Sequence, residues 1–266
     1  MAVFVISEIG VNHDGSLDKA KRLIDAAKEA GADAVKFQFF SSHKLWGDDR
    51  IKHLELSLSD MILLHTHCAR VGIEFMCTPF GVDEVIWLYG LVKRWKIASG
   101  CLTRKSILEA VRDTNLPVIL STGMSTIDEI LAAIAILDCY GTCRLTLLHC
   151  TSSYPCKLED VNLLAMESLP RGYPVGYSDH TTGITVAIAA AAMGATVIEK
   201  HLTFDRQAEG PDHKASIEPK DFRTMVEAIR TVEQALGDGV KRVMPSEVKL
   251  REQWHVASEI DSPSGH

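Results

Sequence analysis

Most of the ionisable side chains that could do chemistry follow directly on short apolar or β-branched runs of the sequence. Lysine ammonium groups and short hydroxyl donors together are typical of sites that bind phosphate or carboxylate. Such an anion cradle is predicted from Lys36, Lys96, Thr78, Ser99 and Ser121.

His180 and His201 follow the last two of these runs and predict a divalent metal site. Imidazole pairs with open coordination positions suit catalytic Mn, Fe, Co or Zn. Glu8, after the first run, would complete a set of two histidines and one acid if the first and last runs are neighbours. For either histidine alone, the alternative is a hydrogen-bonded residue of the core.

The runs are predicted to form eight strands, and segments with apolar residues at helical spacing lie between them. Strands that alternate with helices pair in parallel, which favours a closed (β/α)8 TIM barrel of the α/β class. An open doubly wound sheet is the alternative, but the sequence has no GxGxxG or GxxxxGK[ST] motif. We expect one barrel domain over residues 1–256 and a tail over 257–266. The expected strands cover 4–9, 34–37, 74–77, 95–98, 118–120, 145–149, 175–177 and 196–199.

Length and composition agree with one soluble barrel. The chain has 266 residues, close to the ~250 of a TIM barrel, and 46% of them are hydrophobic. Its net charge of −7, with no basic run, argues against binding to nucleic acid or to an anionic membrane. Seven cysteines without a CxxC motif indicate reduced thiols in the cytoplasm. The N-terminus does not read as a signal peptide, and the uncharged stretch 181–198 is interpreted as a buried helix.

Ordered sequence blocks over residues 3–252 resemble the sialic acid (N-acetylneuraminate) synthase family. The blocks keep the family's order along the whole of that span, which makes a chance match implausible. They are EIGVNHDG (8–15), GADAVKFQ (31–38), CTPF (77–80), KIASG (96–100), LSTGM (120–124), HCT (149–151), YP (154–155), GYSDH (176–180), EKH (199–201) and GPD (210–212).

The resemblance implies a (β/α)8 enzyme that condenses phosphoenolpyruvate with an open-chain amino sugar such as N-acetylmannosamine. The products would be a 2-keto-3-deoxy sugar acid and phosphate.

By position, the resemblance implies that phosphoenolpyruvate meets Lys36, Gln38, Thr78, Lys96, Ser99, Ser121 and Ser178. His180 and His201 would hold Mn²⁺ or Mg²⁺, with Co²⁺ as an alternative. Glu8 would handle the attacking water, and Ser152, Tyr154 and Asp212 would face the acceptor sugar. The resemblance further implies a homodimer.

The sequence departs from the family pattern on the acceptor side. Cys101 stands where the family usually has a glutamate after Ser-Gly, and Ser152 stands where neuraminate enzymes usually have asparagine. The pattern TSSYP at 151–155 is closer to synthases of pseudaminate or legionaminate. The family's C-terminal antifreeze-like domain is expected to be missing. These departures predict that N-acetylmannosamine is a poor acceptor.

Two other functions stay open at this point. Lys36, Lys96 and Lys200 all end expected strands, so a Schiff-base aldolase is an alternative. The interleaved serines and threonines favour anion binding over imine formation. A non-catalytic relative that binds phosphoenolpyruvate or sugar is the second alternative, and the presence of every expected donor residue argues against it.

Overall fold

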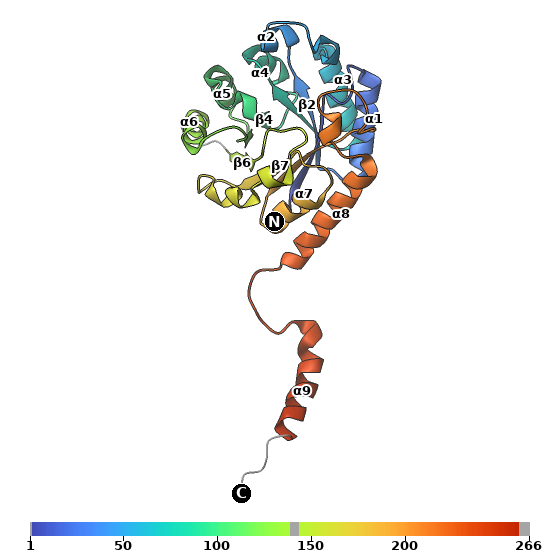
Figure 1. Ribbon diagram of the computed structural model, residues 1–266, viewed down its shortest axis with the longest axis vertical. Coiled ribbons are helices and arrows are strands. Elements are labelled where there is room, and N and C mark those ends of the chain that lie inside the picture. Colours follow the sequence, from blue (N-terminus) through green and yellow to red (C-terminus); the bar gives the residue numbers. More distant parts are fainter. Residues whose placement is uncertain (1, 139–143, 261–266) are drawn as a thin grey trace. The chain divides into compact units, whose positions relative to one another are not determined.

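Eight parallel strands form the wall of a TIM barrel in the computed structural model (Figure 1). The structure describes residues 2–138 and 144–260, with side chains as far as residue 254. The strands pair in the order β3-β2-β1-β8-β7-β6-β5-β4, which leaves β3 and β4 as neighbours without a ladder between their described residues. The predicted fold class is confirmed. The strands are β1 Phe4–Gly10, β2 Ala34–Phe39, β3 Glu74–Pro79, β4 Trp95–Ile97, β5 Val118–Ser121, β6 Leu145–His149, β7 Val175–Asp179 and β8 Val197–His201.

Within residues 2–234, the helices lie on the outside of the strands, and their caps follow the expected chemistry. Ser57 and Asp60 form a capping box at the start of α3, and Thr126 and Glu129 form another at the start of α6. The α-helices are α1 Leu17–Glu29, α2 Ser42–Trp46, α3 Leu58–Val71, α4 Val82–Leu88, α5 Lys105–Arg112, α6 Ile127–Leu137, α7 Thr185–Ala192, α8 Pro219–Leu236 and α9 Val248–Ile260. The 3-10 helices are η1 Lys52–Leu54, η2 Ser99–Cys101, η3 Leu158–Asp160, η4 Leu163–Ser168, η5 His213–Ala215 and η6 Pro245–Glu247.

Two local expectations differ from the structure. The strand β6 is followed by η3 and η4 instead of an α-helix, and Asn162 interrupts them with a left-handed backbone (φ 48°). The stretch 181–198, expected as one buried helix, holds the shorter helix α7 and then the start of β8. Gly194, at φ 98°, turns the chain between them.

The chain divides into two compact units, Met1–Gln234 and Ala235–His266. The expected barrel domain over residues 1–256 and the expected tail over 257–266 stay predictions. Residues 261–266 of the expected tail, and Cys139 and Cys143, lie outside the described residues. The described cysteines are free thiols. None of the described helices is long and apolar enough to cross a membrane.

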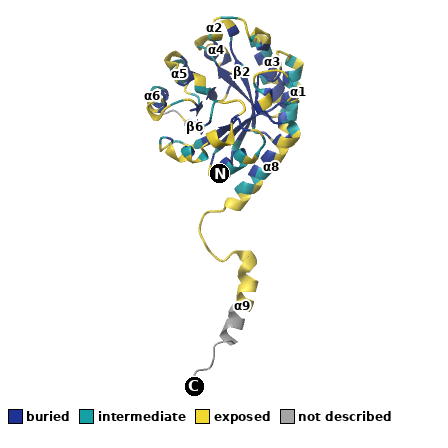
Figure 2. Ribbon diagram, viewed as in Figure 1, coloured by how far each residue is buried: buried dark blue, intermediate teal, exposed yellow. Residues whose placement is uncertain are grey.

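An apolar layer closes the barrel interior below the carboxyl ends of the strands, and Figure 2 shows the strands as the most buried part of the molecule. Side chains alternate along a strand, so the residue two positions further faces the same side. The apolar layer consists of Ile6, Ala34, Met76, Ile119, Leu148 and Val197. Two positions further along the chain stand Glu8, Lys36, Thr78, Ser121, Cys150 and Glu199.

His13, in the turn after β1, links stability to pH. It is fully buried, and its Nδ1 accepts a hydrogen bond from the Gly15 amide at 3.0 Å. Burial lowers the pKa of His13 to about 4. A lowered histidine pKa stabilises the fold above its unfolded value near 6.5, and this contribution is lost as the pH falls toward 4.

We therefore expect the free energy of unfolding to fall by about 2 kcal/mol between pH 7 and pH 5 through His13 alone. His13→Asn should remove that part of the pH dependence. The exposed His43, changed to Asn, serves as the control. Urea denaturation at both pH values measures the effect, and equal pH dependence in wild type and His13→Asn would contradict it.

Candidate active site

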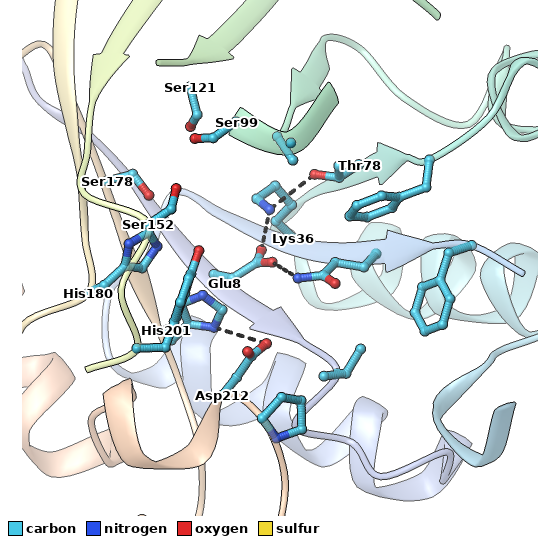
Figure 3. Close-up of a pocket in the computed structure, with 18 of the residues that line it drawn as sticks. Glu8, Lys36, Thr78, Ser99, Ser121, Ser152, Ser178, His180, His201 and Asp212 are labelled. Carbon is cyan, nitrogen blue, oxygen red and sulfur yellow. Dashed lines mark hydrogen bonds and ion pairs between the residues drawn. The ribbon is translucent and has the colours of Figure 1, made fainter. Parts of the chain in front are cut away.

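The thirteen site residues expected from the sequence all line one cavity of about 460 Å³ at the carboxyl ends of the strands. Figure 3 shows Ser99 and Ser121 on one side of Lys36 and Glu8, and Asp212 on the opposite side. The thirteen are Glu8, Lys36, Gln38, Thr78, Lys96, Ser99, Ser121, Ser152, Tyr154, Ser178, His180, His201 and Asp212. The cavity brings them together, while their individual roles stay predictions.

Lys36 and Glu8 form a buried ion pair at the centre of the cavity. The Lys36 Nζ lies 2.6 Å from Glu8 Oε2 and donates to Thr78 Oγ1 at 3.1 Å. Gln38 Nε2 donates to the other Glu8 oxygen at 3.1 Å. Burial raises the pKa of Glu8 to about 7, against the attraction of Lys36. Burial lowers the pKa of Lys36, but the charges of Glu199 and Glu8 outweigh it and the net pKa is raised.

Glu199 lies near both Lys36 and Lys96. Its Oε1 lies 3.5 Å from Lys96 Nζ and accepts a hydrogen bond from Ser178 at 2.9 Å, and its Oε2 lies 3.7 Å from Lys36 Nζ. Lys96 also donates to Ser121 Oγ at 2.7 Å. Burial lowers the pKa of Lys96. Burial would raise the pKa of Glu199, but the two lysines hold it below its ordinary value.

Glu199 was not among the residues expected from the sequence. Its signal was available, because it stands two positions after Val197 of the apolar layer and two before His201. The same alternation shows that Lys200 faces the other side of β8, so the expectation that it lies with Lys36 and Lys96 is wrong. Lys200 is fully buried, lies 2.8 Å from Asp179 Oδ2 and does not line the cavity. It therefore gives no support to an aldolase.

Hydroxyl groups and a glycine shape the cavity wall beyond Lys96. The Gly123 amide donates to Ser99 Oγ at 3.0 Å, and Ser99 Oγ lies 3.2 Å from Cys150 Sγ. A Cβ on Gly123 would stand 2.5 Å from Ser152 Oγ and 2.9 Å from Ser99 Oγ. A glycine is therefore required for these hydroxyls to converge.

The two histidines lie side by side, with ring centroids 5.6 Å apart. The Tyr154 ring is 4.1 Å from His180 and 5.9 Å from His201. His180 Nδ1 donates to the Thr151 carbonyl at 2.8 Å, which leaves its Nε2 as an acceptor. Burial lowers the pKa of both histidines, so both are neutral near pH 7.

The histidine pair fits a divalent metal ion. His201 Nδ1 is buried without a hydrogen-bond partner in the structure, and Asp212 Oδ2 lies 3.7 Å from it. Neutral imidazole is the form that binds metal. Within residues 2–138 and 144–254, three or more His, Cys, Asp or Glu side chains nowhere converge as a ready ligand set. Water and substrate would therefore supply the remaining ligands.

Cys101 does not face the cavity, which corrects an expectation. Its side chain is fully buried in the main hydrophobic core, and its neighbour Gly100 lines the cavity instead. Cys101 therefore contributes no group to the acceptor side in this structure. The sequence reasoning also missed a group of apolar side chains at the cavity mouth, which come from residues 40–54.

The fold and the cavity define a TIM-barrel enzyme with an anion cradle beside an imidazole pair. The family model described as the NeuB family matches residues 23–241, and the chain belongs to this family. It is a phosphoenolpyruvate-condensing sugar acid synthase, which confirms the enzyme class expected from the sequence.

Three similar proteins illustrate the relation. An N,N'-diacetyllegionaminic acid synthase from Legionella pneumophila is 43% identical, over 94% of this chain and 78% of that protein. The human N-acetylneuraminate-9-phosphate synthase is 36% identical, over 98% of this chain and 79% of that protein. The crystal structure of an N-acetylneuraminic acid synthetase from Leptospira borgpetersenii superposes with a TM-score of 0.90 at 36% identity, covering 100% of this chain and 94% of that one.

We expect His180→Ala and His201→Ala each to lower bound metal and activity together, by more than tenfold. Each change removes one of very few protein ligands, and the remaining positions cannot compensate. Metal content by elemental analysis and turnover by phosphate release are the two readouts. His43→Ala, on an exposed histidine, is the matched control. Full activity in chelator-treated wild type would contradict the assignment.

Proposed function

We propose that this chain condenses phosphoenolpyruvate with the open-chain aldehyde of an amino sugar, giving a 2-keto-3-deoxy sugar acid and phosphate. The observation that carries the proposal is the pair of buried lysines, Lys36 and Lys96, which face one cavity together with the neutral histidines 180 and 201. An anionic donor and an aldehyde acceptor require those two features side by side.

The lysines and hydroxyls suit the donor. Phosphoenolpyruvate carries about three negative charges, and fixed cations with short donors hold such an anion away from water. Lys36 with Thr78 and Lys96 with Ser121 already pair a cation with a hydroxyl on adjacent positions of the cavity wall. Ser99, Ser152 and Ser178 would supply further donors.

We propose Mn²⁺ or Mg²⁺ as the cofactor, with Co²⁺ as an alternative, held by His180 and His201 with Asp212 beside them. When bound, such an ion supplies Lewis-acid polarisation of an aldehyde oxygen. The protein's own residues orient the reactants: Tyr154 packs on His180 and closes one side of the histidine pair.

We assign Glu8 to the second half of the reaction. Attack of the donor's C3 on the aldehyde leaves an electron-deficient C2, to which water adds before phosphate leaves. Gln38 and Lys36 hold the Glu8 carboxylate from both sides, so its oxygens have fixed directions. Such a carboxylate can orient the water and accept its proton.

For the acceptor, we propose an aldose with two acylamino groups. Phosphoenolpyruvate contributes three carbons and no nitrogen, so a diacetylated product of the kind named for the Legionella enzyme takes both amides from its acceptor. The higher identity to that enzyme, 43% against 36% for the human synthase, supports the proposal. We also propose a cytoplasmic homodimer, as expected from the resemblance and the free thiols.

We expect Lys36→Ala and Lys96→Ala each to weaken phosphoenolpyruvate binding by about 2–4 kcal/mol, because a buried charge-assisted contact is lost. Titration calorimetry measures the affinity, and circular dichroism shows whether each variant folds. Lys105→Ala, on an exposed lysine, is the control for loss of one positive charge. Unchanged affinity in both folded variants would place the phosphate elsewhere.

Phosphate release from phosphoenolpyruvate with Mn²⁺, across a panel of plain, N-acetylated and diacetamido aldoses, tests the reaction itself. We expect a diacetamido aldose to be turned over and N-acetylmannosamine to show a KM above about 1 mM, beyond the usual enzyme range. Binding of phosphoenolpyruvate without phosphate release for any aldose would favour the non-catalytic alternative.

A further inference from the structure

The mouth of the cavity has an apolar wall that the donor and the metal site do not use. It comes from the segment between β2 and α3, which includes α2 and η1. Phe40 and Leu54 pack with Val11 in a separate buried cluster that holds this segment against the barrel. The cavity residues of the segment are Phe40, Leu45, Trp46, Arg50, Ile51 and Leu54.

The wall lies further out than the reacting groups. Lys36 is 3% exposed and His201 is 5% exposed, whereas Trp46 is 56% exposed although all three line the same cavity. An acceptor whose aldehyde approaches the histidines must extend outward from them. Its far end therefore reaches the mouth.

Arg50 stands at this wall but is already paired. Its Nε lies 2.8 Å from Asp48 Oδ1 and its Nη2 lies 2.6 Å from Asp48 Oδ2, and its guanidinium carbon lies 5.5 Å from the centroid of the Trp46 ring. Among the described residues that line the cavity, the other lysine and arginine side chains are Lys36 and Lys96. Each lysine and arginine among the described lining residues therefore already has a carboxylate partner, and a phosphate would have to displace it.

We propose that Trp46 and the Arg50–Asp48 pair determine acceptor specificity. They favour an acceptor whose far end is uncharged and carries apolar substituents, and they disfavour a phosphorylated end. The inference rests on the proposed function and assigns its acceptor discrimination to these residues.

The physical reason is that an apolar end and a phosphorylated end of the acceptor differ in the free energy of desolvation at this wall. An indole ring gains contact area against methyl or methylene groups at little entropic cost. A phosphate at the same place would lose water and would have to compete with the Asp48 carboxylate for Arg50. Discrimination against a charged end follows without any direct clash.

The first test removes the Asp48 carboxylate, so that Arg50 no longer has its partner. N-acetylmannosamine and its 6-phosphate are measured as competitive inhibitors, or substrates, against the best aldose of the panel. In wild type we expect the 6-phosphate to bind at least fivefold more weakly. Asp48→Ala should improve 6-phosphate binding at least fivefold, and Asp48→Ala with Arg50→Ala should abolish that gain. Asp49→Ala removes a neighbouring acid that is paired with Lys52, and it is the control for net charge.

Trp46→Ala is the second arm. We expect a rise of about tenfold in KM for the best aldose with KM for phosphoenolpyruvate unchanged. Equal inhibition by both sugars in wild type, no gain in Asp48→Ala, or an unaltered aldose KM in Trp46→Ala would each overturn the inference. These outcomes leave turnover of the best aldose intact, whereas failure of the proposed function removes turnover with every aldose.

Discussion

The buried charge cluster of Lys36, Lys96, Glu8 and Glu199 is the constraint on which the rest of the structure depends. A buried charge without a partner is too costly to keep, so each lysine stands near a carboxylate. The apolar layer beneath, from Ile6 to Val197, excludes water from below and strengthens these interactions. Only a rigid barrel can hold four such groups from four strands in register.

In the proposed function, this cluster also prepares the cavity for an anion. The two carboxylates neutralise the two lysines while no donor is bound, and an anionic donor must compete with them. Raising the pKa of Glu8 and lowering that of Glu199 separates two chemically identical groups. Glu199 then stays the counter-ion of both lysines, whereas Glu8, held also by Gln38, is the carboxylate suited to proton transfer.

The sequence predicts the part of the site that follows strand periodicity. Strand ends and period-two alternation are local signals, which is why the barrel and the cavity residues at strand ends could be expected from them. Tyr154 and Asp212 were expected only from the resemblance to the sialic acid synthase family. The strand-end reasoning missed Glu199 and included Lys200 because strand ends were taken without their facing side. The expectation for Cys101 was wrong for another reason. Cys101 lies in η2, and no periodicity in the sequence specifies the direction of that element.

The mouth wall was missed because its residues come from a segment whose shape depends on tertiary packing. Phe40, Leu54 and Val11 fix that segment through contacts between parts of the chain distant in sequence. In the proposed reaction, donor and acceptor recognition therefore have different structural origins. The donor side is built on strands, where a change of side chain disturbs the buried charge cluster. The acceptor side is built on a surface segment over that frame, so it can change its specificity while the buried cluster remains intact.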